Sequence, residues 1–440
     1  MMKNEKGSLL ALLPLIIFVS LFIGTGIISK DFSNMPLNVA VIIASTIALM
    51  MNRKETLLDK VEIFTKGGGH PNIILMAIIF ILAGAFSEVA KGMGAVESTV
   101  NLGMSFIPEN LLMVGLFVIG CFISISMGTS TGTVVALAPI GIGIAGQTDI
   151  SLALSMATVV GGAMFGDNLS MISDTTIAAV RTQNTKMLDK FKVNFFIVLP
   201  GAILTAVILG IITMDNQSNV VGEYPFDLVK VIPYIAVLIA ALAGAHVLIV
   251  LLGGTIFAGI IGIVDGSYSF TGFLQTASEG IMGMQNLAII AIMIGGMVEI
   301  IKHNGGIDYL LNFVTSRIKT KKGAEVGIAS LVSVTDVATS NNTISIIITG
   351  PLAKNIADEY NIDPRKSASI LDIFASCFQG VIPYGGQLLA ASGLAAISPV
   401  SIIPYSFYPV LLGICGLVAI AIGYPKFRQV KGATTASKSS

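Results

Sequence analysis

Apolar segments follow one another along almost the whole chain of 440 residues, and they limit what it can fold into. Crossing a membrane takes about 20 mostly apolar residues, and such segments fold as helices because hydrocarbon offers no hydrogen-bond partners. Several runs are short and rich in Gly and Ser, which indicates broken or re-entrant helices. We predict an all-α polytopic membrane protein with about ten to twelve transmembrane helices. The apolar runs lie near residues 9–28, 36–51, 72–90, 110–126, 133–146, 151–166, 193–214, 231–246, 248–264, 286–301, 326–334, 343–358, 368–382, 386–399 and 404–423.

The composition supports a membrane protein. Hydrophobic residues make up 54% of the chain and charged residues 11%, against roughly a quarter charged in soluble domains. The 25 basic and 25 acidic residues cancel, so the lipid bilayer, and not nucleic acid, is the expected partner. Cys121, Cys377 and Cys415 lie in apolar runs without metal-ligand spacing, and we expect them to be small buried side chains without a metal or disulfide role.

Basic residues between the apolar runs predict the orientation of the chain. The apolar run that follows Lys3 and Lys6 is long enough to span and lacks a signal-peptidase site, so we expect it to be a retained first helix. The segments 30–35 and 215–227 have little positive excess and should face outward. Both termini should then be cytoplasmic. The basic residues expected on the cytoplasmic side are Arg53, Lys54, Lys60, Lys66, Arg181, Lys186, Lys190, Lys192, Lys426, Arg428 and Lys431.

An internal repeat relates the two halves of the chain. Residues 85–94 match residues 296–305, and residues 129–133 match residues 339–343 in nearly the same register. The loops at equivalent places carry opposite charge, because the stretch after Lys302 is basic and the stretch after Lys91 is not. We therefore predict two inverted-topology repeats with a site between them near the middle of the membrane. The expected division is an N-terminal repeat 1–192, a connecting helix and outer loop 193–230, a C-terminal repeat 231–425 and a cytoplasmic tail 426–440.

A polar stretch at residues 161–176 follows a long apolar segment. If this stretch is helical, Asp167, Ser170 and Asp174 stand at i, i+3 and i+7 and share one face. Three glycines weaken the helix just before it, so the acidic face is expected to begin where the helix breaks and free carbonyl groups join it. Such an arrangement is typical of a cation site.

Two further breaks, at residues 124–133 and 333–343, are rich in hydroxyl and amide side chains, and the second contains Asp336. Carboxylate, hydroxyl and amide oxygens suit a small hard cation, and the N-termini of half-helices would suit an anionic substrate group. The alternative is a polar surface loop, or Ser and Thr side chains that hold helices together.

One helical face is predicted at residues 369–379, where Ser369, Asp372, Ser376 and Gln379 stand at i, i+3, i+7 and i+10. An ionisable residue inside a span indicates function, and the alternative for Asp372 is a carboxyl neutralised by a neighbour. Glu88 and Glu299 occupy the same repeat position near the ends of spans, each with a lysine three residues on. They are either accessory ion-binding residues or interfacial ion pairs.

The run Gly166-Asp167-Asn168-Leu169-Ser170-Met171-Ile172-Ser173-Asp174-Thr175-Thr176, continued by residues 177–183, resembles the NhaC family of bacterial Na⁺/H⁺ antiporters in the wider ion transporter superfamily. The resemblance extends to the breaks at 126–133 and 339–343 and covers most of the chain. It implies a secondary transporter of the bacterial inner membrane with inverted repeats and re-entrant hairpins. Some relatives exchange Na⁺ for protons, whereas others move amino acids or carboxylates such as malate and lactate, so an organic solute stays open.

Two other classes fit less well. An intramembrane aspartyl protease would need a Gly-x-Gly-Asp element, but Met164 stands where its first glycine would be, and no Tyr-Asp pair follows in another span. A passive channel normally has a filter made by symmetric rings, and the polar constellation in this chain is asymmetric.

We therefore predict a Na⁺/H⁺ antiporter, not an enzyme, in which carboxyls that bind either Na⁺ or a proton exchange one for the other. No cofactor is expected besides these ions, and an oligomer is left open. The carboxyls expected to bind ions and protons are Asp167, Asp174, Asp372 and Asp336. The residues expected to coordinate the ion or a solute are Asn168, Ser170, Ser173, Thr129, Ser130, Thr131, Thr339, Ser340, Asn341, Asn342, Ser376 and Gln379, with Glu88 and Glu299 as accessories.

Overall fold

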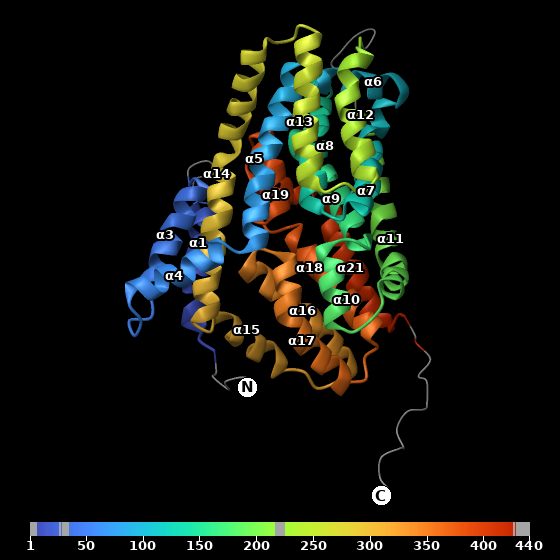
Figure 1. Ribbon diagram of the computed structural model, residues 1–440. Coiled ribbons are helices and arrows are strands. Elements are labelled where there is room, and N and C mark those ends of the chain that lie inside the picture. Colours follow the sequence, from blue (N-terminus) through green and yellow to red (C-terminus); the bar gives the residue numbers. More distant parts are fainter. Residues whose placement is uncertain (1–6, 26–27, 29–34, 216–224, 426, 428–440) are drawn as a thin grey trace, which may run out of the picture.

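The computed structural model describes residues 7–25, 28, 35–215, 225–425 and 427, and this part of the chain is built from helices (Figure 1). The first half contains η1 (Leu9–Leu12), α1 (Leu13–Val19), η2 (Ser20–Gly24), α3 (Leu37–Met50), α4 (Leu57–Gly68), α5 (Pro71–Gly92), α6 (Ala95–Phe106), η3 (Glu109–Leu111), α7 (Leu112–Met127), α8 (Ser130–Gln147), α9 (Leu152–Leu169), α10 (Asp174–Thr182) and α11 (Met187–Ile212). The second half contains α12 (Leu228–Leu242), α13 (Val247–Val264), α14 (Phe270–His303), α15 (Gly306–Thr315), α16 (Lys321–Thr339), α17 (Asn342–Glu359), α18 (Pro364–Gln379), α19 (Gly386–Ala395), α20 (Pro399–Ile402), η4 (Ile403–Tyr405) and α21 (Phe407–Ile422).

The all-α membrane fold expected from the apolar runs is confirmed. Six stretches of the described chain are long and apolar enough to cross a membrane: Pro71–Gly92, Ser130–Gln147, Leu152–Thr182, Met187–Ile212, Val247–Val264 and Phe270–His303. Five shorter apolar helices accompany them: Leu9–Gly24, Leu37–Met50, Leu112–Met127, Leu228–Leu242 and Phe407–Ile422. The segment Gly386–Ala395 and the segment Pro399–Tyr405 meet at an angle of 103°. Such a bend is the form expected of a broken or re-entrant helix.

The internal repeat is visible in the backbone. Helices α5 and α14 end in the matching sequences, and Gly94 and Gly305 then start α6 and α15 with φ of 79° and 80°. The next helices, α7 and α16, both end at a left-handed residue, which is Gly128 in one repeat and Ser340 in the other. In Figure 1 the helices α6, α7 and α8 lie in the upper half, whereas their counterparts α15, α16 and α17 lie in the lower half. The second repeat is therefore turned over relative to the first.

One expected boundary between the repeats falls inside a helix. Helix α11 begins at Met187, so the expected boundary after residue 192 lies inside this helix. The tail 426–440, apart from Phe427, lies outside the described residues, as do most of the segments 30–35 and 215–227 that were expected to face outward.

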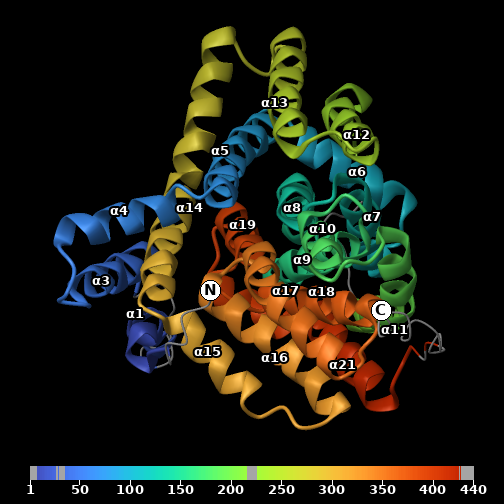
Figure 2. The same cartoon turned by 60° about the horizontal axis from the view of Figure 1, so that its bottom comes forward.

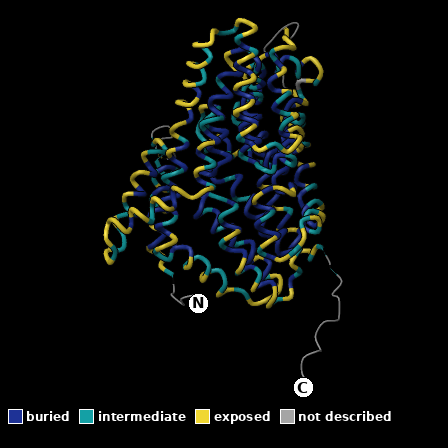
Figure 3. Tube along the Cα trace, in the orientation of Figure 1, coloured by how far each residue is buried: buried dark blue, intermediate teal, exposed yellow. Residues whose placement is uncertain are grey.

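Apolar side chains cover the outside of the bundle. Figure 3 shows the buried residues gathered along its middle and the exposed ones at its periphery and both ends. Ile239 on α12, Ile249 on α13 and Ile422 on α21 are all more than 60% exposed, which suits contact with lipid. Cys121 is buried, Cys377 and Cys415 are half-buried, and all three thiols are free.

The long helices α5 and α14 cross at two glycines. A methyl group added at Gly84 would lie 2.1 Å from the carbonyl oxygen of Gly280, and one added at Gly280 would lie 2.2 Å from that of Gly84. Both neighbours are backbone atoms, so they cannot turn aside as a side chain would. Small residues allow such close approach, and the approach strengthens van der Waals packing between helices in a membrane.

We expect Gly280→Ala to lower the thermal unfolding temperature of the detergent-solubilised protein because the added methyl group forces α5 and α14 apart. An overpacked contact of this kind costs about 1–3 kcal/mol. Gly283→Ala is the matched control, since a methyl group at that position on the same helix meets nothing within 4 Å. Equal unfolding temperatures for the two variants would show that the crossing at Gly280 does not limit stability.

Candidate functional site

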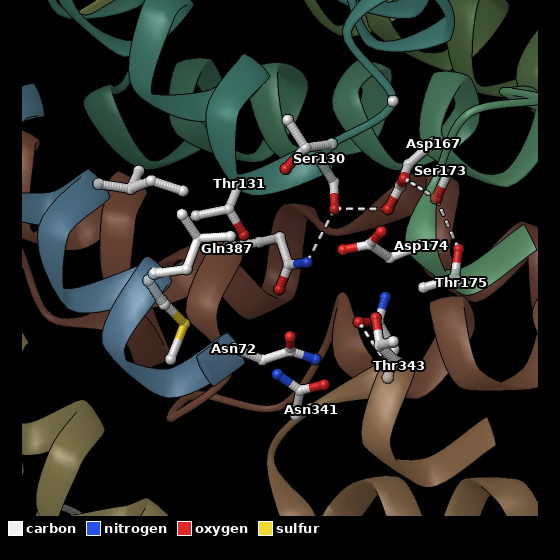
Figure 4. A pocket seen from close by; sticks show the side chains of 16 residues that line it. Asn72, Ser130, Thr131, Asp167, Ser173, Asp174, Thr175, Asn341, Thr343 and Gln387 are labelled. Atoms are coloured by element: carbon white, nitrogen blue, oxygen red, sulfur yellow. Dashed lines mark hydrogen bonds between the residues drawn. The ribbon is translucent and has the colours of Figure 1, made fainter. Parts of the chain in front are cut away.

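Five helices begin around one pocket between the two repeats. The first turns of α5, α8, α10, α17 and α19 all contribute side chains to it, and its volume is about 100 Å³. That space admits an ion with a few waters, since a water takes about 30 Å³ in the liquid. Figure 4 shows its polar side chains pointing toward one another. The residues that line it are Asn72, Leu75, Met76, Ile79, Gly128, Thr129, Ser130, Thr131, Asp167, Ser173, Asp174, Thr175, Asn341, Asn342, Thr343 and Gln387.

Asp167 is the buried carboxyl of this pocket, at 4% exposure. Its Oδ2 accepts a hydrogen bond from the Ser130 hydroxyl at 2.7 Å, and its Oδ1 accepts one from the Ser173 hydroxyl at 2.6 Å. It stands in the last turn of α9, which packs closely on α7. A methyl group added at Gly166 would lie 2.4 Å from the carbonyl oxygen of Cys121. The absence of a side chain at Gly166 therefore lets α9 lie close against α7.

Asp174 enters the same pocket from the other side of a helix break. Helix α9 ends at Leu169, Ser170 takes an extended conformation, and α10 begins at Asp174, which is exposed. The expectation that Asp167, Ser170 and Asp174 share one helical face is therefore wrong. The Ser170 hydroxyl instead donates to the carbonyl oxygen of Ile125 at 2.7 Å. The part of the expectation that placed carboxyls where a helix breaks agrees with the structure.

The two polar breaks predicted in equivalent places both border the pocket. Thr129 caps α8 by accepting from the backbone of Gly132, and Asn341 caps α17 by accepting from the backbone of Ile344. Thr339 and Ser340 end α16 outside the pocket, and the Ser340 hydroxyl donates to the carbonyl oxygen of Tyr384 at 2.8 Å. Helix starts carry a partial positive charge, and those of α8 and α17 meet at this pocket from the two repeats.

Asp372 lies apart from the pocket and is paired with a buried lysine. The Lys190 ammonium group of α11 contacts Asp372 Oδ2 of α18, and the two side chains are 1% and 0% exposed. The same ammonium donates to the carbonyl oxygen of Asn168 at 2.6 Å and to the Thr176 hydroxyl at 2.9 Å. Asp372 Oδ1 has no hydrogen-bond partner among the described residues. The alternative considered for Asp372, a carboxyl neutralised by a neighbour, matches this geometry.

The polar face predicted on α18 turns toward α9, α11 and α19. Ser369 donates to Asn194 Oδ1, Ser376 accepts from Asn168 Nδ2 at 3.3 Å, and Gln379 donates to Gln387 Oε1 at 2.9 Å. Asn194 also donates to Asn168 Oδ1 at 2.7 Å. This face therefore joins the two repeats.

Asp336 is fully buried on α16 and does not line the pocket. The side-chain amide of Gln379 lies beside it, with contacts of 3.1 and 3.3 Å to its two carboxylate oxygens. Glu88 and Glu299 also lie outside the pocket. They form partly exposed ion pairs with Lys91 at 3.8 Å and Lys302 at 3.3 Å, the geometry of the interfacial alternative.

A chain of side chains connects Asp167 with Asp336. Gln387 Nε2 donates to the Ser130 hydroxyl at 2.8 Å, the first step from Asp167, and Gln379 stands between Gln387 and Asp336. The chain has four links, which are Asp167–Ser130, Ser130–Gln387, Gln387–Gln379 and Gln379–Asp336. The hydroxyl and the two amides each supply one hydrogen along it, so three links are filled by these groups and the fourth requires a proton on one of the two carboxyls.

Several residues of the site were not foreseen from the sequence. Lys190 is not a loop cation, contrary to the expectation from its place among Arg181, Lys186 and Lys192. The signal for burial of Lys190 was Asn194, which stands four residues later in the apolar run. Residues at i and i+4 share a helical face, so the two polar side chains point the same way. Asn72 and Gln387 lie at helix starts that the sequence does not single out, whereas Thr175 and Thr176 belong to the polar stretch 161–176 but were not among the expected ligands.

We expect Lys190→Met to destabilise the protein by about 3–5 kcal/mol, because it leaves the Asp372 carboxyl buried and without its counter-charge. The double variant Lys190→Met/Asp372→Asn should recover most of that loss, since it removes both charges. Lys186→Met, at an exposed position one turn earlier, is the control. Chemical or thermal unfolding in detergent measures the difference, and a double variant as unstable as Lys190→Met would contradict the pairing.

Comparison with known proteins identifies the family of the chain. The model of the Na⁺/H⁺ antiporter family matches residues 7–214 and 226–426. The Na⁺/H⁺ antiporter NhaC of Bacillus subtilis is 26% identical over 432 residues, which cover 89% of this chain and 92% of that protein. The malate-2H⁺/Na⁺-lactate antiporter of the same organism is 23% identical and covers 96% of this chain and 97% of its own length. The NhaC antiporter of Alkalihalophilus pseudofirmus is 24% identical over 78% of this chain and 82% of its own. The chain belongs to the Na⁺/H⁺ antiporter family.

Proposed function

We propose that this protein exchanges Na⁺ for protons across the membrane, at the pocket that contains Asp167 and Asp174. The observation that supports it best is that two carboxyls from opposite sides of a helix break enter one oxygen-lined pocket between inverted repeats. Carboxylate and hydroxyl oxygens are suitable ligands for Na⁺. Ser130, Thr131 and Ser173 supply the hydroxyls.

Competition for the same oxygens supplies the coupling. A carboxylate that carries a proton is neutral and a poor ligand, so Na⁺ enters as protons leave. Removal of Na⁺ leaves both carboxyls of the pocket free to take up protons again. Exchange then needs no covalent chemistry.

The four-link chain to Asp336 supports a proposal for where one of the protons is held. The chain is fully hydrogen-bonded when either Asp167 or Asp336 is protonated, with the two amides turned one way or the other. With both carboxyls ionised, two oxygens face each other in a buried place without a hydrogen between them, which is unfavourable. We infer that the two carboxyls share one proton, which sits on Asp336 when Na⁺ occupies the pocket and Asp167 is ionised.

A second candidate function is transport of a small carboxylate coupled to these ions. Five helix starts face the pocket, and the Asn342 Nδ2 group beside it is buried without a hydrogen-bond partner among the described residues. Helix starts and free amide donors favour an anionic group. The match to a malate and lactate antiporter over almost the whole chain is compatible with this candidate.

Asp167→Asn and Asp174→Asn should each reduce Na⁺-driven proton movement at least tenfold, because an amide carries no charge to be exchanged between Na⁺ and a proton. A tenfold change corresponds to about 1.4 kcal/mol. The measurement uses protein in liposomes with a pH-sensitive dye inside and Na⁺ added outside. Asp149→Asn, at an exposed position outside the pocket, is the control.

The outcomes of that assay separate the candidates. Proton movement on Na⁺ alone supports the antiporter. Movement that requires malate, lactate or another small carboxylate would replace it with the second candidate. Normal exchange in both pocket variants would remove these two carboxyls from the mechanism.

Infrared difference spectroscopy tests the shared proton. When Na⁺ is added to the wild-type protein, we expect one protonated-carboxyl band to be lost and another to appear, as Asp167 gives up its proton and Asp336 gains one. Asp336→Asn should lack the new band and release about one more proton per Na⁺ bound, because the pair no longer titrates as a unit. Gln379→Met, which interrupts the chain outside the pocket, should behave likewise, with the exposed Gln275→Met as its control. A wild-type spectrum with losses alone would contradict the shared proton.

A further inference from the structure

A second cavity, of about 380 Å³, lies between α15 and α16, away from the ion pocket. Its volume falls within the range of about 300–1,000 Å³ typical of small-molecule sites. Figure 2 shows the two helices side by side at the surface of the bundle. The cavity therefore lies beside α16, the helix that carries Asp336.

The side chains that face the cavity are large on α15 and small on α16. Helix α15 contributes Leu310, Phe313 and Val314, which share one face at helical spacing. Opposite them α16 contributes Gly323 and Gly327, together with Ser330 one turn further on. The small residues Gly323 and Ser330 leave a groove beside α15, whereas Ile318, which also lines the cavity, fills the space against Gly327. Its walls are mainly apolar, as a hydrocarbon chain requires.

The end of the cavity nearest the start of α16 is strongly basic. Arg317 lines it, with its guanidinium 3.6 Å from the centre of the Phe313 ring and one nitrogen donating to the Phe313 carbonyl oxygen at 2.6 Å. Lys319, Lys321 and Lys322 follow within five residues, and the stretch 309–324 contains no Asp or Glu. Lys321 and Lys322 donate to the carbonyl oxygens of Asn361 and Ala421. Arg317 and Lys319 are both exposed.

We propose that this cavity binds one anionic phospholipid, with an acyl chain in the groove and the phosphate at Arg317 and Lys319. The argument is charge complementarity at one end and apolar surface at the other. A zwitterionic lipid would place its own cation against the four basic residues. An arginine suits a phosphate because its planar group offers paired donors.

A lipid bound in this cavity would contact α16, the helix that carries Asp336. Helix α16 runs from its basic start to the break at Ser340, and Val334, at the inner end of the cavity, stands two residues before Asp336. A chain seated there would fill the space beside the half-helix that carries this carboxyl. We expect the bound lipid to hold α16 in place, so its removal should lower thermal stability.

The test uses the full chain in nanodiscs of phosphatidylglycerol or of phosphatidylcholine, followed by quantitative mass spectrometry of lipid retained after transfer to detergent. We expect retained phosphatidylglycerol to exceed phosphatidylcholine at least tenfold, and the unfolding temperature to be higher in phosphatidylglycerol. Arg317→Gln/Lys319→Gln should remove the preference, because each basic residue near an anionic headgroup contributes about fivefold in affinity. Arg181→Gln/Lys186→Gln, at exposed basic positions elsewhere, is the matched control.

A second variant tests the groove. Ser330→Leu places bulk in the cavity while it leaves all four basic residues, so it should lower retention of phosphatidylglycerol as well. Equal retention of the two lipids by the wild-type protein, or unchanged preference in both test variants, would overturn the proposal. Stabilisation by inorganic phosphate alone in detergent would also overturn it, since that outcome needs no acyl chain. None of these readouts depends on ion exchange, so failure here and failure of the antiport assay are distinguishable.

Discussion

The structure depends on the cost of placing polar groups where there is no water to satisfy them. Every helix break in the membrane frees backbone groups, and every buried carboxyl needs a counter-charge or hydrogen-bond donors. In this protein the partners come from other helices and often from the other repeat. Lys190 of the first repeat neutralises Asp372 of the second, and the buried pair of Glu325 and Lys366 joins α16 to α18 at 2.7 Å. The requirement to satisfy polar groups therefore helps to fix how the two repeats dock.

The sequence was informative wherever a pattern is local. Apolar runs and matched sequence segments predicted helices, two repeats and their breaks, because each segment is recognised from a few neighbouring residues. The polar face of α18 was likewise readable, since helical spacing alone puts Asp372 and Gln379 on one side. Extending the same spacing across residues 167–174 failed. The extended backbone at Ser170 ends the helix, and a face cannot be continued through a break.

Partners were not predictable, because they depend on how distant segments meet. Lys190 resembled a loop cation, since lysines at helix starts are usually solvated, whereas the structure buries it against Asp372 of a distant helix. Gln387 had no distinguishing neighbours, although it connects Ser130 with Gln379. A polar residue in an apolar segment thus indicates that it has a partner elsewhere in the fold. Which residue it is follows from tertiary packing, which spacing in a single sequence does not contain.

The two repeats share a backbone but not their charges. Near the end of the repeat Gly166 falls against Gly380, so the position equivalent to Asp167 is Val381, and the position equivalent to Asp336 is Ser126. Inverted repeats supply two arrangements of similar energy, which the halves reach by moving against each other around a fixed site. The hydrogen bond between Ser130 and Gln387 crosses from one repeat to the other, so such a movement must break it or carry both residues along. Because that bond belongs to the chain between Asp167 and Asp336, the shared proton that we propose would link its own position to the arrangement of the repeats. A symmetric scaffold with asymmetric charges can in this way tie an ion's binding to the direction that the pocket faces.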